Sequence, residues 1–418
     1  MDQIIIHGGR RLKGEVRTSG AKNAALPILA STILGGGECV LSNMPSVVDV
    51  LTMGKLLRML GIAVAQEGEH TVVDAQIIAS TEAPYDLVRT MRASVLVLGP
   101  LVARMGEAKV SLPGGCAIGS RPVNFHLAGL EKMGATVEIE HGYIKATARR
   151  LRGSRIYFDT PSVTGTENLM MAAVLAEGTT VLENAAKEPE ISDLAAFLVK
   201  RGARIAGAGT DMIMIEGVTE LHGADHDVIP DRIEAGTYLV AGAITGGEIS
   251  VKRCRPEHME PLLVKLRESG VELAEEGDRV HLKVTGRLKG TNVRTSPHPG
   301  FPTDMQAQFV ALMAVAEGTS VVTETIFESR FMHVEELRRM GAEIRVEGNR
   351  VVITGREGLT GAPVMASDLR ASAGLIVAGL AAEGITEVSR VYHLDRGYER
   401  LEDKLKALGA SIERRKGK

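Results

Sequence analysis

Residues 332–361 read MHVEELRRMGAEIRVEGNRVVITGREGLTG, and this stretch contains the local pattern on which the chain is built. Met332–Met340 is a charged helical stretch, and Gly341 is the residue type that commonly follows the end of a helix. Apolar residues then recur through Glu343–Glu347 and Arg350–Thr354, with a Gly-Asn pair between the two runs. This arrangement predicts a helix followed by a β-hairpin, closed by a Leu-x-Gly step.

The first part of this pattern, a helical stretch, a junction glycine and an apolar run, recurs six times along the chain, with 68 to 73 residues between successive junction glycines. A repeat at constant spacing indicates a repeated structural unit. In the fifth unit, an apolar helix over Met305–Glu317 and a strand over Ser320–Glu324 precede the pattern, so each unit predicts alternating helices and strands. The junctions are Leu60-Gly61-Ile62, Met133-Gly134-Ala135, Arg201-Gly202-Ala203, Ser269-Gly270-Val271, Met340-Gly341-Ala342 and Leu408-Gly409-Ala410.

The sixth unit is incomplete, because the chain ends soon after the apolar run Ser411-Ile412-Glu413 and no partner strand follows. The chain begins, however, with a strand-like run over Gln3–His7 that belongs to no unit, followed by Leu12-Lys13-Gly14. We infer that the N-terminal strand pairs near the C-terminus and completes the sixth unit.

Grouping the repeats predicts an α/β protein of two similar domains. Residues 22–229 hold three units, and residues 1–21 with 230–418 hold the other three. The chain therefore crosses between domains twice, near Gly20 and near Pro230. Helices such as Ala93–Val102 and Ala371–Ala382 are apolar over most faces, so we expect them inside their domains, walled by sheets.

Composition narrows the classes of function. The 418 residues are 44% hydrophobic with a net charge of −3, which provides no basic field for nucleic acid. No apolar run approaches the length of a membrane span, and the N-terminus lacks the apolar core of a signal peptide. The three cysteines have no metal-type spacing, and no cofactor motif is present. We expect a cytoplasmic protein without cofactor, metal, membrane insertion or obligate protein partner.

Residues 112–122, LPGGCAIGSRP, form the segment whose residue types point most directly to a reactive site. Glycine and proline mark a loop, and the glycines let a ligand approach the backbone closely. Cys116 stands in this loop five residues before Arg121, and a nearby cation favours the reactive thiolate. The alternative is a surface loop that carries an incidental thiol.

Taken in order along the whole chain, seven motifs resemble the enolpyruvyl transferases. That family has two similar domains, each of three βαβαββ repeats, in an inside-out α/β barrel type of fold. The sequence departs from many relatives at Asn124-Phe125, where they carry Asp-Leu. The motifs are Ser19–Pro27, Met91–Ser94, the Cys116 loop through Val123, Asp231–Thr237, Phe301–Gln308, Ser367–Arg370 and Asp395–Arg400.

The resemblance implies transfer of the enolpyruvyl group of phosphoenolpyruvate to the 3′-hydroxyl of UDP-N-acetylglucosamine, an early step of peptidoglycan synthesis. Phosphate is released. It implies that Cys116 protonates the methylene carbon and can form a covalent adduct with phosphoenolpyruvate, and that Asp304 is the base for the acceptor hydroxyl. Lys22 and Arg396 would act on the donor. The implied substrate-binding residues are Lys22, Asn23, Arg92, Arg121, Pro122, Val123, Asn124, Phe125, Thr160, Pro161, Ser162, Val163, Asp304, Ile326, Arg370 and Arg396.

Several of these residues have an ordinary structural interpretation as well. Asp304 or Thr303 could simply cap the helix that follows, and Lys22-Asn23 could be a polar first turn. Thr160–Val163 could be a capped turn, although free backbone N–H groups at a helix start also suit a diphosphate. Other polar residues are predicted to be structural: Asp231 and Asp368 as caps or arginine partners, His126 as a packing histidine, and Cys39 and Cys254 as core thiols in strand-like runs.

Three other functions remain open from the sequence. A transferase acting on shikimate 3-phosphate shares the repeat and the donor, but the Cys116 loop favours the UDP-sugar. A non-catalytic UDP-sugar-binding relative would bind without turnover. A structural scaffold would not explain a thiol in a Gly-Gly loop.

Overall fold

The computed structural model describes residues 2–89, 91–112 and 123–417. The described chain divides into two compact units. The first unit consists of residues from 20 to 112 and from 123 to 229, and the second consists of residues 2–19 and 230–417. The chain leaves the second unit after β2 (Lys13–Arg17) and returns to it after β14 (Asp225–Asp227).

The strands of the described residues form six four-stranded sheets of one design, three in each unit. In each sheet one edge strand runs parallel to its neighbour, and the other pairs are antiparallel. In the first unit the sheets are β14-β3-β5-β4, β6-β7-β9-β8 and β10-β11-β13-β12. Their other strands are β3 (Glu38–Ser42), β4 (Ala63–Glu67), β5 (His70–Asp74), β6 (Glu82–Ala83), β7 (Glu107–Ser111), β8 (Thr136–Glu140), β9 (Tyr143–Thr147), β10 (Arg155–Tyr157), β11 (Thr179–Glu183), β12 (Arg204–Ala206) and β13 (Met212–Glu216).

The second unit repeats this design in the sheets β16-β17-β15-β2, β18-β19-β21-β20 and β22-β23-β1-β24. The predicted hairpin is confirmed, since Glu347 pairs with Arg350 and Glu343 with Thr354. The strands are β1 (Gln3–His7), β15 (Glu248–Lys252), β16 (Glu272–Glu276), β17 (Arg279–Lys283), β18 (Val293–Arg294), β19 (Thr319–Thr323), β20 (Glu343–Glu347), β21 (Arg350–Thr354), β22 (Pro363–Met365), β23 (Ile385–Ser389) and β24 (Ser411–Arg415).

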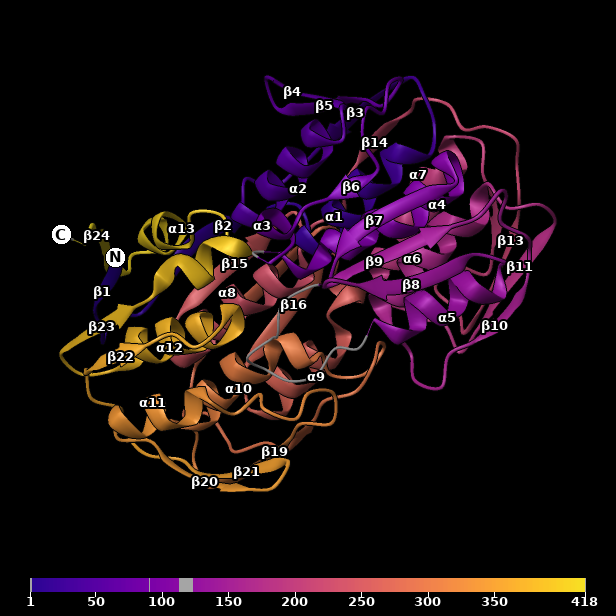
Figure 1. Ribbon diagram of the computed structural model, residues 1–418. Helices are drawn as coiled ribbons and strands as arrows, with labels where there is room; N and C mark the ends of the chain where they lie inside the picture. Colours follow the sequence, from indigo (N-terminus) through magenta and orange to yellow (C-terminus); the bar gives the residue numbers. More distant parts are fainter. Residues whose placement is uncertain (1, 90, 113–122, 418) are drawn as a thin grey trace. The chain divides into compact units, whose positions relative to one another are not determined.

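The inferred closure of the sixth repeat is also confirmed. Strand β1 lies between β23 and β24 and is antiparallel to both, with Ile6 opposite Thr386 on one side and Ile412 on the other (Figure 1). Ile4 and Ile6 are fully buried, whereas His7 is exposed. The first strand of the chain thus supplies the position that the second hairpin strand fills in the other sheets.

The junction glycines end helices as predicted. All six have φ between 87° and 105°, the left-handed region that disfavours a side chain. Each repeat therefore contains the same requirement, a left-handed residue at the end of its helix, and glycine meets it in all six.

One set of helices fills the middle of each unit and another covers the sheets. The inner helices of the first unit are α1 (Lys22–Ser31) continuing into the 3₁₀ helix η1 (Thr32–Leu34), η2 (Arg92–Val97) continuing into α4 (Leu98–Met105), and α6 (Val163–Val174). Those of the second unit are α8 (Arg232–Ile244), η4 (Thr303–Met305) continuing into α10 (Gln306–Met313), and α12 (Leu369–Ala381). The others are α2 (Val48–Met59), α3 (Tyr85–Val88), α5 (Asn124–Lys132), α7 (Pro189–Lys200), η3 (Pro256–His258), α9 (Glu260–Glu268), α11 (His333–Arg339), η5 (Val391–Arg396) and α13 (Leu401–Ala407).

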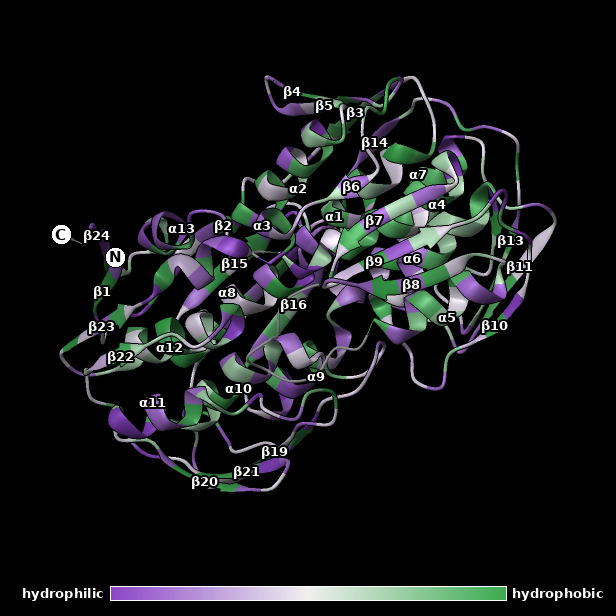
Figure 2. Ribbon diagram, in the orientation of Figure 1, coloured by the Kyte–Doolittle hydropathy of each residue, from purple (hydrophilic) through white to green (hydrophobic). Residues whose placement is uncertain are grey.

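Each unit has its own aliphatic core, built largely on these inner helices. Every residue from Arg370 to Leu380 on α12 is buried, which confirms the prediction that the apolar helices lie inside. Figure 2 shows the contrast within the second unit: α12 is mostly green and white, whereas α13 is largely purple. Within the described residues, none of the helices has the length and apolarity needed to cross a bilayer.

The helix predicted over Ala93–Val102 differs from the observed one. Its first half is the 3₁₀ helix η2, and the α-helix starts only at Leu98. The Asn168 side chain occupies the position of one helical hydrogen bond, accepting from the Gly99 N–H at 2.7 Å and donating to the Val95 carbonyl at 3.2 Å. Pro100 has no N–H to donate to Leu96. The long-range contact from Asn168 therefore replaces the regular helix start.

Candidate functional site

In the first unit, the predicted residue Lys22 is the first residue of α1. Its N-cap residue, Ala21, provides no side-chain cap. The Lys22 Nζ lies 3.4 Å from Asp49 Oδ2, and the two side chains are 12% and 4% exposed. A lysine beside an uncapped helix N-terminus is a suitable arrangement for an anion. Asn23 follows in the same turn and is half-buried.

Two of the predicted binding segments lie together at the starts of α5 and α6. Phe125 on α5 packs edge-on against Phe158, with ring centroids 6.0 Å apart, and Thr160 follows two residues later. Ser162 caps α6 by accepting from the Gly165 N–H at 3.2 Å, so the capped-turn interpretation of this segment is correct. Pro161, Val163 and Val123 are half-buried and Asn124 is exposed.

His126 is a packing histidine, as predicted. Its Nδ1 lies 2.7 Å from Asn168 Nδ2 and its Nε2 lies 3.3 Å from Thr164 Oγ1, which ties α5 to α6. Burial, with a smaller contribution from the charge of Arg92, lowers the pKa of His126 to about 4. Arg92 itself is half-buried at the first position of η2.

This pKa predicts a loss of stability as the pH falls. The unfolded chain binds a proton at His126 near its ordinary pKa of 6.5, whereas the folded protein does so only near 4. Between these values the unfolded state binds more protons, so the free energy of unfolding falls with falling pH, by up to roughly 3 kcal/mol. We expect His126→Asn to make this slope shallower in urea unfolding measured from pH 7.5 to 4.5, while His333, whose pKa burial also lowers to about 4, keeps part of it.

The matched control for that measurement is His141→Asn. His141 lies on an exposed hairpin turn with φ of 50°, which asparagine tolerates. The control should keep the wild-type slope. An equal slope in the His126 variant and the wild type would show that the buried histidine does not govern acid stability.

In the second unit, Asp304 lies in the turn of η4 that leads into α10. It is not the N-cap residue of either helix, since that position is Pro302 for η4 and Met305 for α10. Its Oδ1 accepts from Arg330 Nη2 at 2.9 Å, and its Oδ2 accepts from Arg370 Nε at 3.1 Å and Nη2 at 2.8 Å. The carboxylate remains 25% exposed, whereas both guanidinium-bearing side chains are 4% exposed. Asp304 is thus an oriented carboxylate that a ligand can reach.

Arg370 is held rigidly on α12. Burial lowers the pKa of the Arg370 guanidinium, but the negative charge of Asp304, together with smaller contributions from Tyr398 and Asp231, outweighs burial and raises this pKa above its ordinary value. The guanidinium carbon lies 5.4 Å from the centre of the Tyr398 ring. The Tyr398 hydroxyl in turn bonds Thr237 Oγ1 at 2.9 Å and Gln308 Nε2 at 3.1 Å. This buried network fixes the direction in which Arg370 faces Asp304.

Arg396 is the half-buried last residue of η5, beside the start of α12. A Cβ at Gly397 would lie 2.7 Å from Leu369 Cδ2, so the two segments approach closely. Burial and then the Arg396 charge lower the pKa of His393. Ile326 is 36% exposed in the loop after β19.

The residues predicted to be structural behave as such. Asp231 caps α8 and Asp368 caps α12, each through one carboxylate oxygen that accepts two backbone N–H groups. Cys39 and Cys254 are buried free thiols. Cys39 lies in β3, but Cys254 lies in the turn after β15 rather than in a strand. Burial raises the pKa of Cys254 to about 11, which leaves it as an unreactive thiol.

Three predicted site residues, Cys116, Arg121 and Pro122, lie outside the described residues. Conversely, the structure adds two residues that the sequence did not single out. Asp49 resembles any acidic residue in the first turn of a helix, and Arg330 resembles any loop arginine. Their distances to Lys22 and Asp304 reveal them, and no local sequence signal does.

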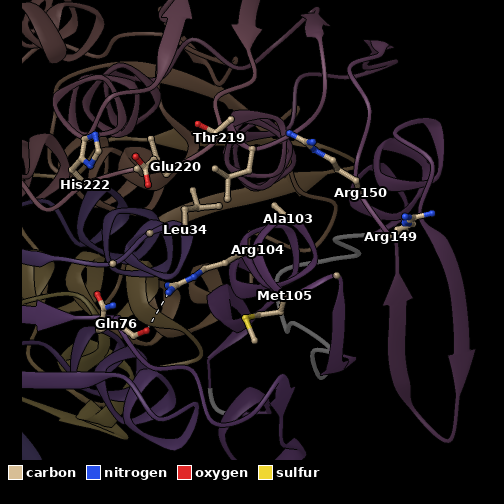
Figure 3. A pocket seen from close by; sticks show the side chains of 15 residues that line it. Leu34, Gln76, Ala103, Arg104, Met105, Arg149, Arg150, Thr219, Glu220 and His222 are labelled. Atoms are coloured by element: carbon tan, nitrogen blue, oxygen red, sulfur yellow. Dashed lines mark hydrogen bonds between the residues drawn. The ribbon is translucent and has the colours of Figure 1, made fainter.

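A cavity of about 820 Å³ in the first unit lies away from these residues (Figure 3). It opens where η1, α4 and α6 end, between residues such as Gly35, Gly106 and Leu175. Its Arg104 side chain donates to the backbone carbonyls of Ile33 and Ala75, both at 2.8 Å. Among the described residues, none of those predicted to bind substrate lines it, and its Arg104 is engaged in capping backbone groups.

The six repeated sheets around inner helices place this chain in one family of folds, and the comparisons with known proteins identify that family. The chain belongs to the EPSP synthase family of enolpyruvyl transferases, since the family model EPSP synthase (3-phosphoshikimate 1-carboxyvinyltransferase) matches residues 6–405. A curated relative from Myxococcus xanthus (strain DK1622), UDP-N-acetylglucosamine 1-carboxyvinyltransferase, is 59% identical over 419 residues and both full lengths.

Solved structures agree on the fold. The enolpyruvyl transferase NikO from Streptomyces tendae superposes with a TM-score of 0.90 at 28% identity, covering 99% of each chain. An EPSP synthase from Acinetobacter baumannii has a TM-score of 0.79 at 18% identity over the whole of both chains, a likeness of fold alone. The predicted two-domain enolpyruvyl transferase fold is thereby confirmed.

Proposed function

We propose that this protein transfers the enolpyruvyl group of phosphoenolpyruvate to the 3′-hydroxyl of UDP-N-acetylglucosamine and releases phosphate, a step of peptidoglycan synthesis. The observation that carries the proposal is the 59% identity to a relative named for this activity, extending over both full lengths. The two buried free thiols fit the reducing cytoplasm, where we place the reaction.

The reaction has two balanced steps. The acceptor oxygen adds to C2 of phosphoenolpyruvate while its proton passes to a base and C3 gains a proton from an acid. C3 then loses a proton, the bond from C2 to the phosphate oxygen breaks, and the double bond re-forms. The donor carries several negative charges that require cations, and no electron transfer is involved.

We assign the base to Asp304, because its carboxylate is oriented by Arg330 and Arg370 yet stays accessible. We assign the acid that protonates C3 to Cys116, because its loop matches the family motif that carries this acid. A thiol with a pKa near the working pH can both donate that proton and add to C2.

The anionic groups of the substrates are assigned by unit. In the first unit, Lys22 at the start of α1 binds the donor phosphate. Asn23, Arg92 and Arg121, which belong to the same family motifs, also bind substrate. The capped start of α6 at Thr160–Val163 and the segment Pro122–Phe125 take the nucleotide. In the second unit, Arg370 and Arg396 take donor groups and Ile326 contacts the acceptor.

Phosphate release on mixing the protein with phosphoenolpyruvate and UDP-N-acetylglucosamine tests the proposal. A parallel reaction with shikimate 3-phosphate tests the sibling activity. Release only with shikimate 3-phosphate would replace the proposed acceptor. Tight binding of the UDP-sugar without any release would indicate a non-catalytic binding protein.

Selective alkylation is a further expected result. An epoxide phosphonate that mimics phosphoenolpyruvate should modify Cys116 and spare the other two cysteines. Cys39 and Cys254 are each 1% exposed, and the raised pKa of Cys254 suppresses its thiolate. Peptide mass spectrometry of the labelled native protein provides the measurement. Equal labelling of all three cysteines would contradict the prediction that the site recruits the phosphonate to Cys116 alone.

A further inference from the structure

A buried carboxylate near Asp304 has no place in the reaction as assigned so far. Glu324 follows β19 and is 2% exposed. Its Oε1 accepts from Thr295 Oγ1 at 2.8 Å and from the backbone N–H groups of Ile326 at 2.8 Å and Phe327 at 3.3 Å. Its Oε2 accepts from Thr303 Oγ1 at 2.8 Å. Four donors converge on the two carboxylate oxygens of one buried side chain, so its capacity to accept hydrogen bonds is well used.

The Oε1 side of Glu324 fixes the loop that carries Ile326. Thr295 adds two bonds to the same turn, accepting from the Thr325 N–H at 2.9 Å and, through its carbonyl, from Thr325 Oγ1 at 2.6 Å. The backbone at Ile326 is therefore set by a buried acceptor and not by the exposed side chains of the loop.

The Oε2 side leads to Asp304 through one hydroxyl group. Because Thr303 donates its only hydroxyl proton to Glu324, its lone pairs face elsewhere, and one accepts from Arg330 Nη1 at 3.2 Å. The other terminal nitrogen of Arg330 donates to Asp304 Oδ1. The guanidinium also lies over the Phe327 ring, 5.1 Å from its centre. Arg330 is thus held by groups that Glu324 positions.

We propose that Glu324 is a positioning residue that sets two parts of the site at once: the acceptor loop at Ile326 through Oε1, and the Asp304 base through Thr303 and Arg330. This inference rests on the proposed function. It adds to it a reason why the base has a single orientation. A base displaced by a fraction of an ångström from the acceptor hydroxyl loses rate, whereas substrate affinity depends on contacts elsewhere.

Thr303→Val and Glu324→Ala separate the two arms, and Thr303→Ser is the rescue variant. Thr303→Val keeps the shape of the side chain and removes only the link from Glu324 to Arg330. We expect kcat to fall by about 10- to 100-fold with little change in KM for the UDP-sugar. Thr303→Ser restores the hydroxyl and should recover most of kcat. Glu324→Ala releases the loop as well, so it should also raise KM for the UDP-sugar.

Thr291→Val is the matched control, because Thr291 is another buried threonine of the second unit whose hydroxyl accepts from Ser269 at 3.1 Å. Its backbone N–H donates to Met313 Sδ, at the opposite end of α10 from Asp304. This variant should keep the wild-type kcat. If Thr303→Val does not fold, Glu324→Gln provides the same measurement. Its amide oxygen can keep the Oε1 contacts, and its amide nitrogen would meet the Thr303 hydroxyl as a donor.

The outcomes are distinct. A folded Thr303→Val protein with wild-type kcat, or a Thr303→Ser protein as slow as the valine variant, would overturn the positioning role. In the same assay, a wild-type protein that releases no phosphate from the two substrates would overturn the proposed function itself.

Discussion

Replacing Asp304 by asparagine is expected to lower kcat for phosphate release by roughly 10²- to 10⁴-fold, the usual loss when a general base is removed. Asparagine has almost the same shape but cannot take the acceptor proton. The variant should also unfold more easily, by about 1–3 kcal/mol. Arg330 and Arg370 lose the charge that both of their buried side chains contact. Steady-state kinetics with saturating substrates and thermal unfolding provide the two measurements.

Asp403→Asn is the control for Asp304→Asn. Asp403 forms an ion pair with Arg400 at 2.9 Å, and their side chains are 44% and 76% exposed. A pair so exposed contributes little to stability, so this variant should match the wild type in both measurements. A folded Asp304→Asn protein with near-normal kcat would remove Asp304 from the role of base.

Cys116→Ala is expected to have a comparably large effect, a fall in kcat on the order of 10²- to 10⁴-fold, because C3 protonation loses its acid. Cys116→Asp should retain activity, since a carboxyl group can donate the proton although it cannot form the thioether adduct. Carboxyl groups ionise at lower pH than thiols, so the pH profile of this variant should shift toward acid. Initial rates across pH 5 to 9 provide the comparison.

Cys39→Ala serves as the control for the thiol variants. Cys39 is buried in β3, so its loss should affect stability but leave kcat unchanged. Near-normal turnover by Cys116→Ala would exclude the acid role. An inactive Cys116→Asp protein would show that the covalent step, and not only proton donation, is required.

The repeat architecture was predictable because it depends on short-range rules. A helix that ends at a left-handed glycine is specified within about 20 residues and occurs six times, and a hairpin with glycine in its turn follows it in the first five units. Placement of β1 between β23 and β24 followed from one missing strand. The caps at Asp231 and Asp368 are equally local, since each carboxylate bonds N–H groups two and three residues ahead.

The sequence by itself thus determined the repeat, the burial of the inner helices and the family, through local backbone preferences and ordered motifs. The surroundings of Asp304 were decided only by the tertiary structure. Its partners Arg330 and Arg370 are 26 and 66 residues away in sequence, and Thr303, equally eligible as a cap, turns to Glu324 instead. Likewise, Asn168 alters the helix start near Gly99 from 69 residues away. Such contacts arise when separately specified elements pack together, so no local pattern encodes them.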